Sequence, residues 1–414
     1  MHPNPTSANR EAATTTLSSL AWLRRDDAAI LIVVLVLAGY PLLGTLIAMT
    51  LLPSLVASVP VRAMVIMLSL MLLLSMNRRR WRQPGNLLIL TFWLVYVARL
   101  LWDMLFAQIP IANIYLFNFV FFCIVPATAL MHAPAFDERR LVRLLLPACM
   151  LTCVFALIAG NTDLTGVRSY TDDNEGRLFL ETVNPITFGQ IGVTTVLMAL
   201  CWSRSCRRWS DWLAVAAAVL LGVSTISIAA SRGPLVSLSI CLLVLALFYR
   251  PFRWMLMPIA VLVFFLVSSD FSDSSNLLLS RIDFTKQSDH SEERMLIQAS
   301  AINQFHGSPL FGSAIVEPLS GNYPHNLFIE VAMATGVVGL ALIAWIVVTL
   351  LRKCTHRIRV SLLPLALLMI QHLVDSQFSG NLSASAPLWI LLTLVTSTPI
   401  RIDKSLSVRN KVSR

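Results

Sequence analysis

Apolar residues occur in this chain as long stretches separated by shorter polar segments. A helix that crosses a membrane needs roughly 20 predominantly apolar residues, within a range of about 17 to 25. The pattern predicts an all-α polytopic membrane protein with about twelve transmembrane helices, of which 61–76 and 255–269 are short. The predicted spans are 28–49, 61–76, 86–106, 112–131, 144–160, 185–202, 211–230, 233–249, 255–269, 326–351, 360–376 and 384–399.

Lys and Arg concentrate in every second segment between these spans and in the two ends of the chain. These segments hold 24 of the 32 basic residues. Basic loops stay on the cytoplasmic side of a membrane, and an even number of spans leaves both ends of a chain on one side. The distribution therefore predicts that both termini are cytoplasmic. The basic segments include "RRRWR" (78–82), "DERRLVR" (137–143), "RSCRR" (204–208) and "RKCTHRIR" (352–359).

Two polar segments on the opposite, outer side are long, and the larger one separates spans 9 and 10. A long polar loop among short ones is usually functional. Within it, 293–306 carries apolar residues at helical spacing, which predicts a helix lying on the membrane face, and Asp289 suits its start. The predicted organisation is a tail (1–27), spans 1–5 (28–160), an outer loop (161–184), spans 6–9 (185–269), the large outer loop (270–325), spans 10–12 (326–399) and a tail (400–414).

The composition supports a membrane protein and excludes several other classes. Hydrophobic residues make up 56% and charged residues 13% of the 414 positions, against about 25% charged in soluble domains. The net charge of +10 reflects the basic loops that set the orientation in the membrane, and attraction to anionic lipid is a by-product. It does not indicate nucleic-acid binding. The seven cysteines lie in apolar or Arg-rich stretches, so no disulfide framework is expected. No nucleotide-binding or metal-binding motif stands out, and Asp270 and Asp273 of "DFSD" lack further ligands.

Positive charge is scarce on the outer side, so each arginine there needs a physical reason. Arg232 lies in "AASRGPL" between two spans, where an ionised group needs a partner such as a ligand phosphate. Gly233 and Pro234 predict a tight turn at this point, with the proline starting the next helix. Two alternatives remain open for Arg232: extension to the lipid headgroups, or an ion pair with Asp375 or Glu330.

Three further outer arginines are Arg168, Arg177 and Arg294. A guanidinium binds phosphate oxygens at two points and stays charged at every relevant pH, so converging arginines suit a lipid-linked pyrophosphate. For Arg177 and Arg294 the alternative is an exposed ion pair with the neighbouring acids. Arg168 is expected to be solvated.

His325 precedes the tenth span, in the sequence "YPHN". An imidazole can accept a proton from a sugar hydroxyl near neutral pH. We expect His325 in the first turn of its helix, where the helix dipole lowers a histidine pKa and favours the neutral form. The alternative is a capping or surface histidine. Asp375, at the outer end of its span, could orient this histidine or neutralise an arginine.

With these residues in place, the chain resembles the O-antigen ligase family of bacterial envelope glycosyltransferases, whose signature region O-antigen polymerases share. The resemblance covers roughly 165–390. Its most specific part contains His325, Asn326 and Glu330. The four similar segments are "GRLFLETVNPITFGQ", "STISIAASRGPLVSLSI", "ERMLIQASAINQFHGSPLFGSA" and "YPHNLFIEVAMATGVVGLALIAW".

The resemblance implies transfer of a glycan from undecaprenyl pyrophosphate to an acceptor sugar, lipid A-core in particular, at the periplasmic face of the bacterial inner membrane. It implies twelve membrane helices and a large outer loop built around a lipid-exposed cavity, and no metal or other cofactor. By position, Arg232, Arg294 and Arg177 match pyrophosphate-binding arginines, and His325 matches the histidine that activates the acceptor hydroxyl. Asp375 matches a late aspartate less closely, because its flanking sequence differs.

Other functions remain as alternatives. A polymerase would use the same chemistry with another lipid-linked glycan as acceptor. A transporter of lipid-linked glycans would need charged residues approaching from both membrane faces, whereas the arginines discussed above cluster on one. A protein-directed oligosaccharyltransferase is disfavoured because no soluble domain follows the last predicted span.

Overall fold

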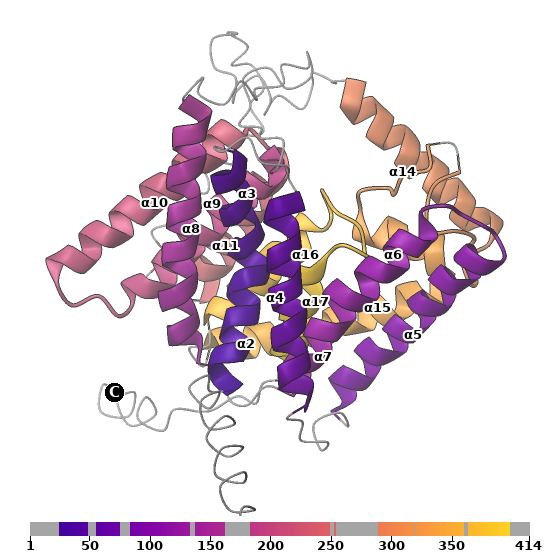
Figure 1. Ribbon diagram of the computed structural model, residues 1–414, viewed down its shortest axis with the longest axis horizontal. Helices are drawn as coiled ribbons and strands as arrows, with labels where there is room; N and C mark the ends of the chain where they lie inside the picture. Colours follow the sequence, from indigo (N-terminus) through magenta and orange to yellow (C-terminus); the bar gives the residue numbers. More distant parts are fainter. Residues whose placement is uncertain are drawn as a thin grey trace, which may run out of the picture.

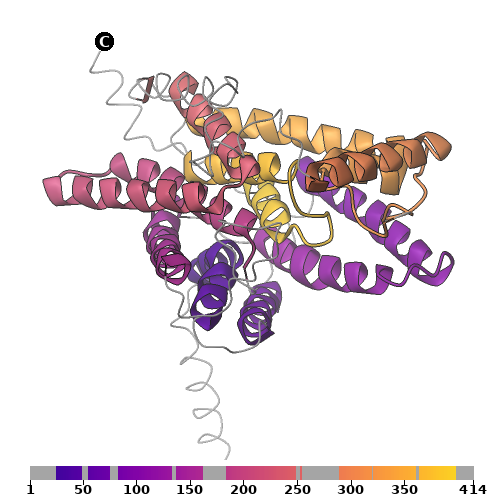
Figure 2. The ribbon, with the colours of Figure 1, turned by 90° about the horizontal axis from the view of Figure 1, so that it is seen from above.

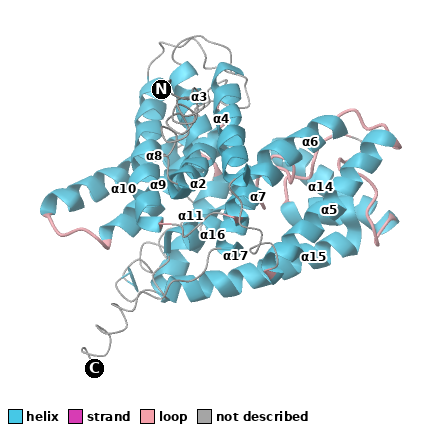
Figure 3. Cartoon of the chain, turned by 60° about the horizontal axis from the view of Figure 1, so that its bottom comes forward, coloured by secondary structure: helices cyan, strands magenta, loops and turns pink. Residues whose placement is uncertain are grey.

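The computed structural model describes residues 25–48, 55–74, 83–132, 137–161, 183–248, 252–253, 289–318, 320–359 and 363–397. These residues are mostly helical and contain no β-strand (Figure 1 and Figure 3). The helices before the first long gap near residue 162 are α2 (Arg25–Val34), η2 (Leu35–Gly39), α3 (Tyr40–Ala48), α4 (Leu55–Leu74), α5 (Pro84–Leu105), α6 (Ala112–Asn118), η4 (Phe119–Ile124), α7 (Val125–Met131) and α8 (Glu138–Asn161). The later helices are α9 (Pro185–Ser203), α10 (Trp209–Ala229), α11 (Arg232–Phe248), α14 (Asp289–Gly307), α15 (Leu327–Arg359), α16 (Leu363–Asp375) and α17 (Ala386–Ser397).

The helices agree with the predicted spans wherever the structure describes them. Seven are long and apolar enough to cross a membrane, and four apolar helices are shorter. The predicted span at 255–269 lies outside the described residues. An all-helical, multi-pass architecture is therefore confirmed, whereas the count of twelve stays a prediction. The seven are Asp27–Ala48, Pro84–Leu105, Ala112–Met131, Glu138–Ala159, Pro185–Ser203, Trp209–Ala229 and Leu327–Thr355; the four are Ser58–Leu74, Arg232–Phe248, Leu363–Asp375 and Ala386–Ser397.

Helix α9 is the most enclosed of the seven long helices. In its most apolar 18-residue stretch 72% of the residues are buried, against 33–44% in the other six. It packs directly on α10, where a Cβ atom built on Gly192 would lie 2.7 Å from the carbonyl oxygen of Gly222. Small residues let two helix backbones touch in this way, and close packing drives helix association inside lipid.

Two spans contain π-helical segments, η2 and η4, which interrupt otherwise continuous helices. A proline follows two residues after each segment: Pro41 after η2 and Pro126 after η4. A proline has no N–H, and its ring pushes against the carbonyl four residues earlier. The local change to wider hydrogen bonding accommodates this, and such segments are frequent at functional sites.

Helices α16 and α17 lie at the centre, between a group that includes α8–α11 and a group formed by α5, α6, α14 and α15 (Figure 1 and Figure 3). They contain only 13 and 12 residues. At 1.5 Å per residue, α16 rises about 20 Å, which is less than the roughly 30 Å of a hydrocarbon core. The segment that joins them, residues 376–385, is named the recessed turn below.

Helix α15 is broken at Gly336, whose backbone (φ 65°, ψ −159°) is not helical. The segment that follows α14 crosses this break: the amide of Val337 donates to the carbonyl of Pro309 at 2.8 Å, and that of Ser313 donates to Met333 at 3.0 Å. Helix α14 runs beside α15 (Figure 2). The break thus provides the backbone groups that hold the end of α14 in place.

Replacement of Gly336 by alanine should destabilise the protein. The new Cβ atom would lie 2.4 Å from the carbonyl carbon of Leu310, at a φ of +65° that alanine rarely adopts. We expect a loss of about 1–3 kcal/mol from backbone strain alone, seen as a lower Tm of the detergent-solubilised protein. Gly307→Ala is the matched control, because no heavy atom lies within 4 Å of the position that its new methyl group would take. Equal Tm values for the two variants would contradict the conclusion that the backbone at Gly336 requires a glycine.

Candidate active site

Arg232 is the first residue of α11, and its side chain is half-buried. The preceding helix ends at Ala230, which has a left-handed backbone (φ 46°, ψ 44°). The tight turn therefore comes slightly earlier than predicted, at Ala230, whereas Pro234 lies in the first turn of α11, which agrees with the prediction that it starts the next helix. A proline is tolerated there because first-turn amides have no partner within the helix.

Gly233 and Pro234 also have packing roles. A Cβ atom on Gly233 would lie 3.1 Å from the Cβ atom of Phe378, and one on Gly189 would lie 2.6 Å from the ring of Pro234. The start of α11 is thus pressed against both α9 and the recessed turn. This packing sets where the Arg232 side chain begins.

The sequence had predicted His325 in the first turn of its helix. This was wrong, because His325 lies two residues before the start of α15 at Leu327. Asn326 caps the helix: its Oδ1 accepts hydrogen bonds from the amides of Phe328 (3.1 Å) and Ile329 (3.2 Å). His325 has a left-handed backbone with φ 55°. This conformation costs a residue with a Cβ atom roughly 1–2 kcal/mol, and strained residues of this kind cluster at functional sites.

The environment of His325 keeps the imidazole neutral. Burial, together with the positive charge of Arg294, lowers its pKa from 6.5 to about 4, and the charge of Glu293 opposes the shift. The ring packs on Tyr323 with centroids 4.3 Å apart. Its Nδ1 atom is buried and has no hydrogen-bond partner among the residues the structure describes. The predicted direction of the pKa shift agrees with these surroundings, but burial is its main cause and not the helix dipole.

Helix α14 brings Arg294 towards His325. The side-chain amide of Gln298 donates to the carbonyl of Pro324 at 3.1 Å, and Arg294 lies one helical turn before Gln298. On α14, Ile297 and Ala301 are buried, whereas Met295 is 52% exposed. The predicted helix is thus present, and its position on the membrane face stays a prediction. The helix starts at Asp289, which also agrees with the prediction.

The recessed turn connects the starts of α11 and α15. The amide of Leu327 donates to the carbonyl of Ser376 at 3.1 Å, and the side chain of Asn326 donates to the carbonyl of Gln377 at 3.3 Å. The next residue, Phe378, is the one that contacts Gly233. Arg232 and His325 are therefore neighbours of the same three-residue stretch, at the end of the molecule opposite the basic segments.

Asp375, the last residue of α16, is 3% exposed. Ser237 and Gln371 lie beside it, but Ser237 donates to Pro234 at 3.0 Å and the side-chain amide of Gln371 to the carbonyl of Gln190 at 3.0 Å. Both carboxyl oxygens thus lack a hydrogen-bond partner among the described residues. A buried group of this kind is costly, and it offers two acceptors to a ligand.

Glu330 holds the recessed turn in place. It is buried, and both of its carboxylate oxygens accept from the amide of Leu382 at 3.1 Å. The phenol of Tyr96 lies beside it. Glu330 therefore holds the turn through the backbone amide of Leu382.

The turn lies within the thickness of the membrane helices and not at their outer ends. The amide of Leu365, near the start of α16, lies 3.4 Å from the Glu138 carboxylate at the basic end of α8. At the other end, the thiol of Cys123 donates to the carbonyl of Ser383 at 3.4 Å, and Cys123 is close to the middle of Ala112–Met131. Ser383, within the turn, is thus level with the middle of that span, whereas His325 directly precedes α15 and Asp375 ends α16.

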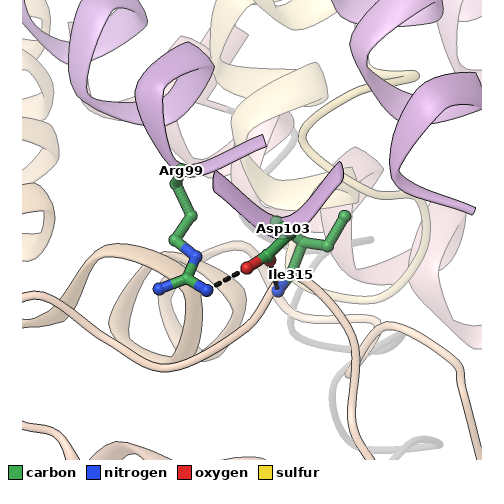
Figure 4. A network of polar contacts seen from close by, with 3 residues as sticks. All are labelled: Arg99, Asp103 and Ile315. Carbon is green, nitrogen blue, oxygen red and sulfur yellow. Dashed lines mark hydrogen bonds and ion pairs between the residues drawn. The ribbon is translucent and has the colours of Figure 1, made fainter. Parts of the chain in front are cut away.

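Sequence reasoning missed a buried ion pair that holds the segment before His325. Asp103 on α5 pairs with Arg99 and accepts a hydrogen bond from the amide of Ile315 at 2.9 Å (Figure 4). Glu317 accepts from the hydroxyl of Ser300 on α14 at 2.5 Å. Two opposite charges four residues apart inside an apolar span were the signal that could have revealed the first anchor.

Arg177, Arg168, Asp270 and Asp273 lie outside the described residues, so their predicted roles stay predictions. Within the described ranges, no group of three or more His, Cys, Asp or Glu side chains could hold a metal ion. The structure thus brings together His325, Arg294, Arg232, Asn326 and Asp375 around the recessed turn, with Glu330 behind it.

Comparison with known proteins gives one family. Residues 216–344 match the family model described as O-Antigen ligase. The match includes Arg232, Arg294, His325 and Glu330, and it ends before Asp375. No curated protein sequence matches the chain.

The depressed pKa of His325 predicts a pH-dependent loss of stability. The unfolded imidazole takes up a proton near pH 6.5, whereas the folded one stays neutral until about pH 4. Stability should therefore fall as the pH drops through this window. His325→Asn removes the titration and keeps a residue that tolerates a left-handed backbone. Its Tm should fall less than that of the wild type between pH 7.5 and 4.5, whereas His306→Asn, on exposed α14, should follow the wild type. Equal falls in all three would contradict the shift.

Proposed function

We propose that this chain, a member of the O-antigen ligase family, is a membrane glycosyltransferase that moves a glycan from undecaprenyl pyrophosphate to an acceptor sugar. The expected acceptor is lipid A-core, and the reaction takes place at the periplasmic side of the bacterial inner membrane. The observation that carries the proposal is the convergence of a neutral, half-buried imidazole with Arg294 and Arg232 around one recessed turn.

The orientation follows from charge. The basic segments lie at the ends of the helices away from His325, and basic loops are retained in the cytoplasm. Both termini are then cytoplasmic, and the loops 161–184 and 270–325 are periplasmic. The donor, whose glycan is periplasmic, reaches the site from the side on which His325 lies.

His325 acts as the general base. Its neutral imidazole accepts the proton of the acceptor hydroxyl, whose oxygen forms a bond to the anomeric carbon of the donor. The bond between that carbon and the pyrophosphate oxygen breaks, and its electron pair leaves with undecaprenyl pyrophosphate. A single direct displacement inverts the configuration at the anomeric carbon.

The arginines stabilise the leaving group. Negative charge grows on the pyrophosphate as the bond breaks, and Arg232 and Arg294, joined by Arg177, are suited to meet it at two points each. A donor placed where charge develops is worth about 3–4 kcal/mol. A pyrophosphate is already a good leaving group, so this chemistry needs neither a metal nor another cofactor.

Asp375 and Asn326 have supporting roles. Asp375 offers two buried oxygen atoms next to the start of α11, where they can orient an arginine or accept a substrate hydroxyl. Asn326 caps α15 and bonds Gln377, which sets the position of the preceding histidine. Membrane lipids surround the apolar helix faces and deliver the donor.

His325→Asn should lower glycan transfer by roughly 10²-fold or more, because a general base contributes about 10²–10⁴-fold. The measurement uses purified full-length protein with lipid-linked donor and acceptor, so transfer without a second compartment also excludes a pure transporter. His306→Asn serves as the control and should keep wild-type transfer. Wild-type transfer by His325→Asn, with an unchanged Tm, would disprove the base assignment.

The nearest alternative is a polymerase, which would join one lipid-linked glycan to another with the same residues. Because polymerases share the signature region, the family match does not separate the two; the single dominant outer loop favours the ligase. Deletion of the gene separates the two. Loss of a ligase leaves full-length glycan on its lipid carrier and none on the core, whereas loss of a polymerase leaves single repeats on the core. We expect the first phenotype.

A further inference from the structure

Arg62 is a charged residue near the start of an apolar helix, at the outer end of the predicted span 61–76, and the mechanism above does not use it. It lies seven positions after Leu55, the first residue of α4, or about 10 Å along the helix axis. Its side chain is exposed. An ionisable group within a membrane span is costly and, as a rule, marks a functional site.

No acid neutralises this arginine in the part of the chain that the structure describes. The ion pairs found there join Arg99 to Asp103 and Arg140 to Asp27. The neighbours of Arg62 are aromatic instead. Its guanidinium carbon lies 4.8 Å from the ring centroid of Phe122, and its charge acts on the phenol of Tyr40.

The contact with Phe122 sets the depth of the guanidinium. Phe122 lies near the middle of Ala112–Met131, and the adjacent Cys123 bonds the carbonyl of Ser383 in the recessed turn. An arginine that extended to the lipid headgroups would leave the ring and follow α4 towards its start. Arg62 is instead held at the depth of the candidate active site, on another face of η4.

The surroundings of Arg62 are built from the two π-helical segments. Tyr40 follows η2 directly, and Phe122 belongs to η4. A Cβ atom on Gly39 would lie 3.3 Å from the side chain of Val61, so η2 packs closely on α4 next to Arg62. Both irregular segments therefore meet α4 at one level, and Tyr40, Arg62 and Phe122 define what we name the Arg62 site.

We infer that the Arg62 site binds the phosphate of a membrane lipid. Stacking on Phe122 uses one face of the guanidinium and leaves N–H donors at its edge, which match phosphate oxygens at two points. An anion that arrives through the lipid removes the cost of an unpaired charge at this depth. Two kinds of lipid carry a suitable phosphate: a polyprenyl carrier, which has a pyrophosphate, and a phospholipid, which has a phosphodiester.

The test measures lipid retention by the full-length protein with native mass spectrometry. The probes are undecaprenyl pyrophosphate, phosphatidylglycerol and undecaprenol, which has the same chain as the first but no phosphate. Arg62→Gln should weaken retention of at least one phosphate lipid by roughly tenfold, the loss expected for one charge-assisted contact, and Arg62→Lys by less. Undecaprenol should be retained equally by all variants. The lipid that responds identifies the ligand.

Arg143→Gln, which removes an exposed arginine at the basic end of α8, is the control for loss of one charge and should retain all probes like the wild type. Equal retention of both phosphate lipids by Arg62→Gln and the wild type would overturn the inference, as would an equal fall for undecaprenol. The inference does not depend on the transfer reaction: a wild type that transfers no glycan would refute the proposed function and leave the Arg62 site standing.

Discussion

The recessed turn depends on the requirement that backbone polar groups inside a membrane be satisfied by the protein. Irregular backbone at such depth is tolerated only where other parts of the chain supply its hydrogen bonds. Here the carboxylate of Glu330 accepts a hydrogen bond from the amide of Leu382, and the indole N–H of Trp389 donates to the carbonyl of Leu382 at 3.0 Å. Because water is scarce at this depth, loss of the Glu330 carboxylate would leave the turn without a necessary acceptor.

The same turn sets the geometry of the candidate site. Its first residues bond the start of α15, and Phe378 packs against the start of α11. Helix α14 adds Arg294, and the buried pair of Asp103 and Arg99 holds the segment that leads to His325. Charges act more strongly in a site of low dielectric constant than in water. A recessed site therefore favours a neutral imidazole, and it would strengthen binding of the proposed pyrophosphate.

Hydropathy and helix spacing predicted the positions of the helices closely, because a span of apolar residues has one stable form in lipid. Local details were less predictable. The turn before α11 was expected at Gly233 and Pro234 but is made by the left-handed Ala230, and Gly233 packs against Phe378 inside the first turn of the helix that Pro234 was expected to start. His325 was expected within α15, yet Asn326 satisfies the first amides and starts the helix one residue later.

The sequence by itself determined the class of the protein and the positions of the helices, and it predicted the orientation and the residues proposed for transfer, because these follow from composition and from periodicity along the chain. Only the tertiary structure decided the depth of the site, the meeting of Arg294 with His325, and the anchors at Asp103 and Glu330. Such features arise from contacts between residues far apart in the chain. No local pattern encodes the distance between a carboxylate on α15 and an amide after α16, since packing of the whole helix bundle sets it.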